Sequence, residues 1–268
     1  MKGIHSSNAT AVKQCCANLY ESDLAKALLG DSFHPGGLKL TERLGQLLQL
    51  GEHGRVLDVA SGRGTSAFFL AEKFGCTVIG LDYGKQNVDM ANASAAERGI
   101  SPHVRFEQAD AEQLAFADAS FDAVICECAF CTFPGKAKAA CEFARVLRQG
   151  GRVGISDLTR SAELPEGLET LLAWISCIGD AQPVQKYLEW FSLAGLLARG
   201  TESHDAALRE MVRQVQAKLL GAEVLVGLKK MDLPGIDFTS AKQTAATALS
   251  AVQQGHLGYA LITAEKAR

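Results

Sequence analysis

The feature that most constrains the fold is an alternation of short apolar runs with helix-like stretches between residues 55 and 156. Such alternation is typical of βαβ units, which build a parallel sheet. The strand runs are apolar throughout, as expected for strands covered by helices on both faces. The sequence therefore predicts a doubly wound α/β sheet. Its predicted strands are 55–59, 77–82, 104–108, 121–126 and 151–156, and its predicted helices are 65–74, 87–98 and 136–147.

Helix-like stretches also flank this core. Ahead of it, a proline and two glycines force a loop at 31–37. The helices expected there lie around the Cys15 and Cys16 pair, over 24–29 and over 38–50. Behind the core, periodicity predicts helices over 168–178, 184–194, 205–220 and 239–254, and strands over 196–202 and 257–263. We expect a single domain with an N-terminal helical cap (1–50), a cofactor-binding core (51–202), a helical insertion (203–255) and a terminal strand (256–268).

Charge and cysteine content narrow the class of function. The formal net charge is −3 and no lysine or arginine stripe follows a predicted helix, so nucleic acid is not an expected partner. The N-terminal residues are polar and no apolar run is long enough to span a bilayer, which predicts a cytoplasmic protein outside the membrane. Because that compartment keeps thiols reduced, the eight cysteines are not expected to form disulfides, and some are candidates for chemistry.

A turn rich in small residues follows the first predicted strand. Asp58 lies in the strand, Ala60 follows it, and Gly62 and Gly64 come directly before the helix. Glycines let the backbone approach a ligand, and the N–H groups at a helix start can bind polar groups. Glycine turns also occur for packing reasons alone, and Ala60 replaces the first glycine of the usual pattern. The turn indicates a cofactor site only together with other signals.

The second predicted strand supplies such a signal. It ends at Asp82 and Tyr83, roughly 20 residues after the turn, the spacing at which an acidic side chain binds a ribose diol. The alternative is that Asp82 caps the helix that follows. Strand end and spacing together favour the ribose role.

The third strand runs into Asp110, Ala111 and Glu112, and a Phe-Ala-Asp-Ala-Ser-Phe-Asp segment precedes the fourth. With the two glycines before the fifth strand, these motifs resemble class I S-adenosylmethionine-dependent methyltransferases over about residues 50–157. The resemblance implies a Rossmann-like methyltransferase sheet with S-adenosyl-L-methionine as cofactor. It also implies that the methionine moiety is held by Asp58, Gly62 and Gly64, the ribose by Asp82 beside Tyr83, and the adenine by Asp110 and Ala111.

Two cysteine-bearing segments resemble those of arsenite methyltransferases. One holds Cys126, Glu127 and Cys128 at the end of the fourth strand, and the other holds Cys177. The resemblance implies that Cys128 and Cys177 bind trivalent arsenic as catalytic and substrate-binding residues, with Cys15 or Cys16 as a third thiol. Thiolates prefer soft centres, and the arsenic lone pair would attack the methyl group. Such a reaction needs the arsenic atom and the methyl carbon to be aligned, but it needs no general base.

Other candidates have plainer interpretations. We expect Cys76, Cys126 and Cys141 to be small buried hydrophobic residues, as free cysteines often are. Cys131 fits either a buried or a functional role, and His34 either a solvated loop or the mouth of the pocket.

The function expected from the sequence is methyl transfer to a small thiophilic acceptor, with trivalent arsenic as the first candidate. One alternative is a methyltransferase for a small organic acceptor or thiol, in which the cysteines merely line the pocket. Another is a sensor that binds a metalloid without transferring methyl groups. The partner is in each case a small molecule or a metalloid.

Overall fold

A computed structural model describes residues 9–21, 34–164, 168, 177–228 and 237–267. The helix expected over 24–29 and most of the one expected over 168–178 lie outside the described residues. In the part of the chain that is described, no helix is long and apolar enough to cross a membrane.

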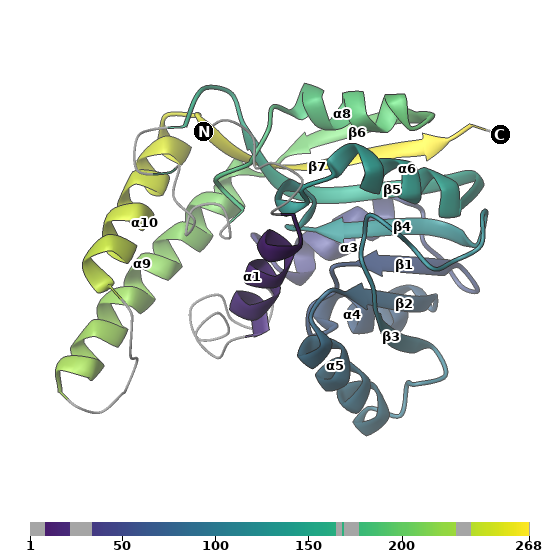
Figure 1. Ribbon diagram of the computed structural model, residues 1–268, viewed down its shortest axis with the longest axis horizontal. Helices are drawn as coiled ribbons and strands as arrows, with labels where there is room; N and C mark the ends of the chain where they lie inside the picture. The colour runs from purple at the N-terminus through teal and green to yellow at the C-terminus, as the bar shows by residue number, and fades with distance from the viewer. Residues whose placement is uncertain (1–8, 22–33, 165–167, 169–176, 229–236, 268) are drawn as a thin grey trace.

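The core is one seven-stranded sheet in the order β3-β2-β1-β4-β5-β7-β6 (Figure 1). The first five strands run parallel, whereas β7 pairs antiparallel with both β5 and β6. The predicted doubly wound methyltransferase-type sheet is thereby confirmed. The strands are β1 (Arg55–Val59), β2 (Thr77–Asp82), β3 (Val104–Gln108), β4 (Phe121–Glu127), β5 (Leu147–Arg160), β6 (Leu196–Ser203) and β7 (Leu257–Lys266).

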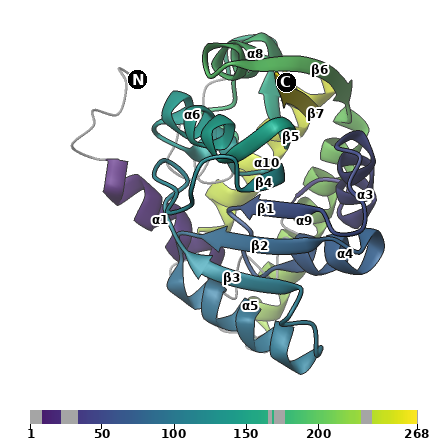
Figure 2. The ribbon, with the colours of Figure 1, turned by 90° about the vertical axis from the view of Figure 1, so that its right-hand side faces the viewer.

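Helices cover both faces of the sheet, because alternate strand residues point to opposite sides. In β1, Val56 packs with α3 (Leu38–Leu47), α4 (Thr65–Phe74) and α5 (Lys85–Glu97). Its neighbour Leu57 packs with α6 (Lys136–Val146) and α8 (Val184–Leu193) on the other face. Figure 2 shows α6 and α8 on one side of the strands and α3 and α4 on the other. Both apolar cores therefore share one sheet.

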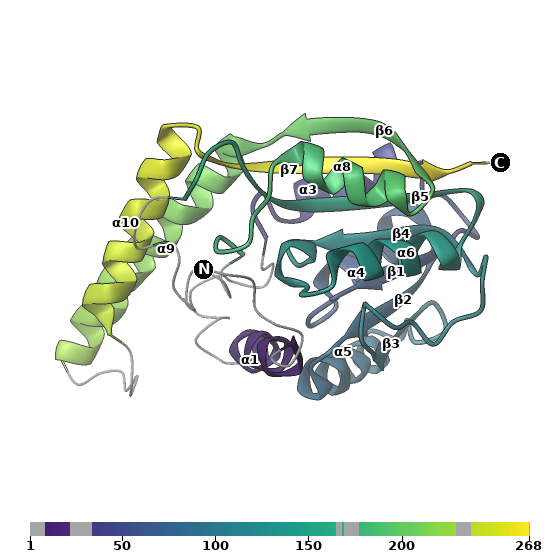
Figure 3. The ribbon, with the colours of Figure 1, turned by 45° about the horizontal axis from the view of Figure 1, so that its top comes forward.

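The remaining described helices lie toward the carboxyl ends of the parallel strands. Helix α1 (Ala9–Glu21) lies beyond the tips of β1 and β2, and a short 3-10 helix, η2 (Phe130–Thr132), follows β4 (Figure 1). Helices α9 (Asp205–Gly227) and α10 (Phe238–Gln253) form an antiparallel hairpin between β6 and β7 (Figure 3). Helices α1, α9 and α10 thus stand at the end of the sheet where parallel-sheet sites open.

Strand β5 and helix α9 are much longer than the sequence predicted. Strand β5 spans Leu147–Arg160 rather than 151–156, because β7 pairs with it as far as Arg160 and stabilises its polar end. Helix α9 continues to Gly227 rather than stopping at 220, since α10 packs along it. In both cases a tertiary partner extends an element beyond its local apolar pattern.

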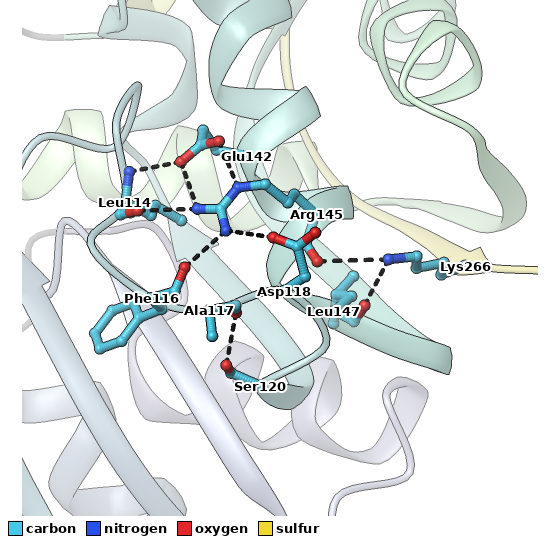
Figure 4. A network of polar contacts seen from close by, with 9 residues as sticks. All are labelled: Leu114, Phe116, Ala117, Asp118, Ser120, Glu142, Arg145, Leu147 and Lys266. Carbon is cyan, nitrogen blue, oxygen red and sulfur yellow. Dashed lines mark hydrogen bonds and ion pairs between the residues drawn. The ribbon is translucent and has the colours of Figure 1, made fainter.

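Arg145 in α6 holds the connection between β3 and β4 (Figure 4). Its guanidinium donates to the Phe116 carbonyl at 2.7 Å, the Leu114 carbonyl at 2.9 Å and the Asp118 carboxylate at 2.8 Å. Glu142, one turn earlier in α6, accepts from the same guanidinium at 2.8 Å. This network fixes the segment that directly follows Asp110, at the rim of the sheet.

Candidate active site

A cavity of about 150 Å³ opens between α1 and the carboxyl ends of β1, β2 and β4. The wall on the sheet side comes from the turn after β1 and from strand ends, and the wall on the cap side comes from α1 and the loop before α3. Most of the residues predicted for the site lie in this wall: Cys16, Asp58, Gly62, Asp82, Tyr83, Asp110, Ala111 and Cys128. Gly64, Cys15 and Cys177 are not among the lining residues.

The turn after β1 keeps the left-handed backbone conformation that favours glycine, although Ala60 replaces the usual glycine. Ala60 has a φ of 59°, in the left-handed region that L-residues avoid at about 1–2 kcal/mol. Gly62 and Gly64 follow with φ of 53° and 84°. At Gly64 a Cβ atom would lie 2.4 Å from the Phe106 ring, so this glycine is required for packing. Gly62 lies in the cavity wall.

Asp82 ties the turns after β1 and β2 together. Its carboxylate accepts from the Gly62 and Gly84 N–H groups, each at 2.8 Å, and from the Asn87 amide at 3.3 Å. Burial raises the pKa of Asp82, and these hydrogen bonds offset the rise only in part. The N-cap of helix α5 is Gly84. Asp82 therefore does not cap this helix, which was the alternative to a ribose role. The carboxylate instead faces the cavity.

Asp58 is the buried acid at the end of β1. Burial, then the nearby Glu127 and Asp82, raise its pKa well above the usual value. Within the described part of the chain, its Oδ2 atom has no hydrogen-bond partner, and the same holds for Ser61 Oγ and Asn87 Oδ1. Buried polar atoms without partners are rare, because leaving them unpaired costs about 1–3 kcal/mol. All three residues line the cavity, so its wall offers unsatisfied groups to a polar ligand.

Lys13 fastens α1 over the outer end of the cavity, a contact that sequence reasoning missed. Its ammonium lies 2.8 Å from the Asp110 carboxylate and 3.0 Å from Glu112. Burial lowers the pKa of Lys13, but the two carboxylates more than offset this and raise it overall. A second contact, from Arg63 to the Glu21 carbonyl at 3.1 Å, holds the other end of α1. Polar contacts therefore help to hold α1 beside the cavity.

The structure brings Cys128 and Cys177 together across 49 positions. The Cys177 thiol donates to the Cys128 carbonyl at 3.0 Å. Cys131 lies within hydrogen-bond reach of Cys177, and Cys16 faces the group from α1. Cys128 and Cys16 line the cavity, whereas Cys131 and Cys177 are buried behind its wall.

Cys128 and Cys16 are held as thiols rather than thiolates. The hydrogen bond with Cys177, together with burial, raises the pKa of Cys128 well above the usual value, and burial raises that of Cys16 to about 12. Among the described residues, no group of three or more His, Cys, Asp or Glu side chains could hold a metal ion. The roles predicted for Cys15, Cys16, Cys128 and Cys177 stay predictions.

Three other cysteines were expected to be buried, and two of them are. Cys126 is buried in β4, and Cys76 is buried just before β2, where its thiol donates to the Leu70 carbonyl. The prediction for Cys141 was wrong, because this thiol is exposed on α6. A helix that covers a sheet keeps one face in solvent, and Cys141 lies on that face.

Glu127 and His34 meet at the inner end of the cavity. Glu127 ends β4 and its carboxylate accepts hydrogen bonds from Thr41 and Ser66. His34, on the loop before α3, is buried and places Nε2 3.5 Å from that carboxylate. Sequence reasoning did not assign Glu127 a role, although its position at a strand end was the available signal. For His34, the structure favours the pocket over the solvated loop.

A doubly wound sheet with a glycine-bearing turn and acidic strand ends around one cavity defines a class of enzymes that bind a nucleoside-containing cofactor. Residues 50–195 match the family described as methyltransferase domain. The chain belongs to this family, as the class I methyltransferase motifs predicted.

Two similar proteins match along most of the chain. The 27-O-demethylrifamycin SV methyltransferase of Amycolatopsis mediterranei is 29% identical over 91% of this chain and 93% of its own length. The O-methyltransferase resE of Aspergillus sclerotiorum is 28% identical over 85% of this chain and 81% of its own. Neither is an arsenite methyltransferase by name.

A solved structure shares the whole architecture. Phosphoethanolamine N-methyltransferase 2 of Haemonchus contortus, solved with S-adenosyl-L-methionine, superposes with a TM-score of 0.78 at 16% identity, covering 100% of this chain and 61% of that one. At this identity the match shows the fold.

Proposed function

We propose that this chain transfers a methyl group from S-adenosylmethionine to an oxygen atom of a small organic molecule. The observation that carries the proposal is the two-sided wall of the cavity. Carboxylates and a glycine-bearing turn form the sheet side, and side chains of α1 and of the loop before α3 close the other side. The sheet side suits a nucleoside-containing methyl donor. The side formed by α1 and the loop before α3 is then left for the methyl acceptor.

The donor fits the unsatisfied groups on the sheet side. The free Oδ2 atom of Asp58 suits the amino group of the methionine moiety, and the Gly62 turn lets the ligand approach the backbone. Asp82 keeps lone pairs beyond its bonds to Gly62 and Gly84, enough to accept from a ribose diol. Asp110 and Ala111 are the proposed adenine contacts. The bound cofactor would supply an electrophilic methyl group on a sulfonium.

Oxygen is favoured as the acceptor atom by the relatives that extend beyond the cofactor core. The two similar proteins with O-methylation in their names match over 91% and 85% of this chain. Matches of this length extend beyond residues 50–195. Because the cap supplies Lys13, Cys16 and His34 to the wall, it is the part suited to select the acceptor.

Trivalent arsenic is the second candidate acceptor, favoured by the contact between Cys177 and Cys128. Binding would require Cys128 to lose its proton, although the hydrogen bond with Cys177 and burial hold its pKa high. Cys177 would also have to leave the Cys128 carbonyl. The burial of Cys177 and the raised pKa of Cys128 therefore support packing thiols over thiolates that bind a substrate.

The test is an acceptor screen with the purified full-length chain and S-adenosylmethionine. The panel contains phenols, secondary alcohols, amines, thiols and arsenite, and mass spectrometry identifies the methylated atom. We expect methyl ethers from hydroxyl compounds. Methylation of arsenite or of thiols alone would replace oxygen by a thiophilic acceptor. Tight arsenite binding without any methyl transfer would select the metalloid sensor.

A further inference from the structure

The wall of the cavity carries more acidic than basic side chains. Four carboxylates line it: Asp58, Asp82, Asp110 and Glu127. Its two permanent cations are Lys13 and Arg63. Lys13 is engaged, because its ammonium pairs with Asp110 and Glu112. Arg63 differs from it: among the described residues it forms no ion pair, and its guanidinium donates one hydrogen bond, from Nη2 to the Glu21 carbonyl at 3.1 Å.

The Nε atom of Arg63 lacks a partner. It is buried and, in the part of the chain that the structure describes, has no hydrogen-bond acceptor. An unpaired buried donor is costly, and more so on a charged group. A ligand in the cavity that accepts from Nε would remove this cost. Because the guanidinium holds five N–H donors in one rigid plane, a carboxylate suits it best, since it accepts two parallel bonds.

Arg63 also lies where the donor would carry its carboxylate. It stands between Gly62 and Gly64 in the turn after β1. The proposed function places the amino group of the methionine moiety at Asp58, in the strand that leads into this turn. In S-adenosylmethionine the amino group and the carboxylate share one carbon atom, so the carboxylate must lie near the same turn. The acids of the wall repel it, which leaves Arg63 to hold it.

We propose that Arg63 recognises the carboxylate of the methyl donor, and that the same guanidinium links donor binding to the docking of α1. This inference rests on the donor arrangement of the proposed function and is independent of the acceptor atom. The link runs through Glu21, the last residue of α1, whose carbonyl already accepts from Arg63. A carboxylate bound to Nε holds the guanidinium where it donates to Glu21. A donor that carries the carboxylate therefore stabilises docked α1 more than one that lacks it.

The first test compares two ligands that differ by one group. S-adenosylhomocysteine carries the carboxylate, and decarboxylated S-adenosylhomocysteine keeps the adenine, the ribose and the amino group. Calorimetric titration of the purified full-length chain measures the affinity for each. We expect the wild type to prefer S-adenosylhomocysteine by roughly 10- to 100-fold, as for a charged hydrogen-bonded pair, and Arg63→Met to lose this preference. An equal preference in both proteins, or none in the wild type, would overturn the assignment.

Two variants control for the docking of α1 and for the loss of charge. Lys13→Met removes the contacts of α1 with Asp110 and Glu112 without touching the guanidinium, so it should weaken both ligands by the same factor. Arg105→Met removes an exposed arginine of β3 that pairs with Glu107 outside the cavity, and both affinities should stay at wild-type values. If either control also lost the preference for the carboxylate, the selection would not belong to Arg63.

Hydrogen exchange tests the link to α1. With saturating ligand, the backbone amides of residues 9–21 should exchange more slowly in the wild type with S-adenosylhomocysteine than with its decarboxylated analogue. In Arg63→Met the two ligands should protect α1 equally. Equal protection in the wild type would overturn the link between the carboxylate and the docking of α1.

The inference and the proposed function fail in different ways. If Arg63→Met keeps the full preference for the carboxylate, only the role of Arg63 is lost. If S-adenosylhomocysteine does not bind the wild type, the donor arrangement fails and the inference fails with it. Methylation of nitrogen, carbon, sulfur or arsenic alone would overturn the oxygen acceptor and leave the role of Arg63 intact.

Discussion

The sheet side of the cavity is lined by strand ends and one turn, whereas the cap side is lined by side chains that the fold brings together from distant segments. Asp58, Gly62 and Asp82 lie within one βαβ unit, and backbone N–H groups hold Asp82 in place. His34 meets Glu127 only because α3 docks on the sheet. Local backbone geometry thus builds the proposed donor side, and tertiary packing builds the proposed acceptor side. Substitutions on the two sides should therefore differ in their effects.

The largest effect is expected for Asp82→Ala. It removes the acceptor of two backbone hydrogen bonds and the proposed ribose contact, and losing a charged partner costs about 1.5–3 kcal/mol. Calorimetric titration should show affinity for S-adenosylmethionine reduced by roughly 10- to 100-fold. Asp89→Ala is the control, since Asp89 is exposed on α5 and pairs only with Lys85 among the described residues. Equal affinities for the two variants would remove Asp82 from the donor side.

A slightly smaller effect concerns Asp157, a buried carboxyl beside the thiols. Burial raises its pKa to about 7, while an unfolded aspartate titrates near 3.9. The folded carboxyl therefore keeps a proton that the unfolded chain has lost. Its contribution to the free energy of unfolding is complete below about pH 4 and is lost as the pH rises through about 7.

Urea unfolding at pH 5.5 and 7.5 checks this prediction. The wild type should lose up to about 2 kcal/mol more than Asp157→Asn over this interval, given about 1.4 kcal/mol per pH unit. The same change in both proteins would show that Asp157 titrates normally and that the thiols lie in a more polar environment than the burial of Cys131 and Cys177 indicates.

Cys177→Ala distinguishes packing from chemistry at the thiols. If Cys177 is a buried packing residue, the variant loses about 1 kcal/mol of stability with its weak hydrogen bond and part of its side chain. Methyl transfer to a hydroxyl acceptor should remain near the wild-type rate. Cys141→Ala, on the exposed face of α6, should change neither property. If methyl transfer were abolished in Cys177→Ala but not in Cys141→Ala, the result would support a substrate-binding thiolate site at Cys177.

The smallest effect is expected for Ala60→Gly. A left-handed φ of 59° strains alanine by about 1–2 kcal/mol, whereas glycine gives back about 0.5–1 kcal/mol as chain entropy. The free energy of unfolding should rise by about 0.5 kcal/mol, measured by urea unfolding. A loss of stability would mean that the turn does not hold Ala60 in this conformation.

The same contrast explains what the sequence could predict. Strand ends follow from apolar runs, so Asp58 and Asp82 could be placed at the cavity without a structure. The polar extension of β5 could not, because only its pairing with β7 makes it a strand. Nothing in the sequence around Lys13 indicates that it pairs with Asp110 and Glu112, because these residues lie about a hundred positions away. Glu127 stood at a visible strand end, but its contact with His34 brings in a loop about 90 positions earlier in the chain.

The most direct test of this account is a crystal structure with S-adenosylhomocysteine. We predict that its ribose hydroxyls donate to Asp82, its adenine lies at Asp110 and Ala111, and its amino group satisfies Oδ2 of Asp58. The sulfur would then point toward the side of the cavity that α1 and the loop before α3 close. A ligand bound elsewhere, or one that leaves Asp58 without a partner, would contradict the division of the cavity into a donor side and an acceptor side.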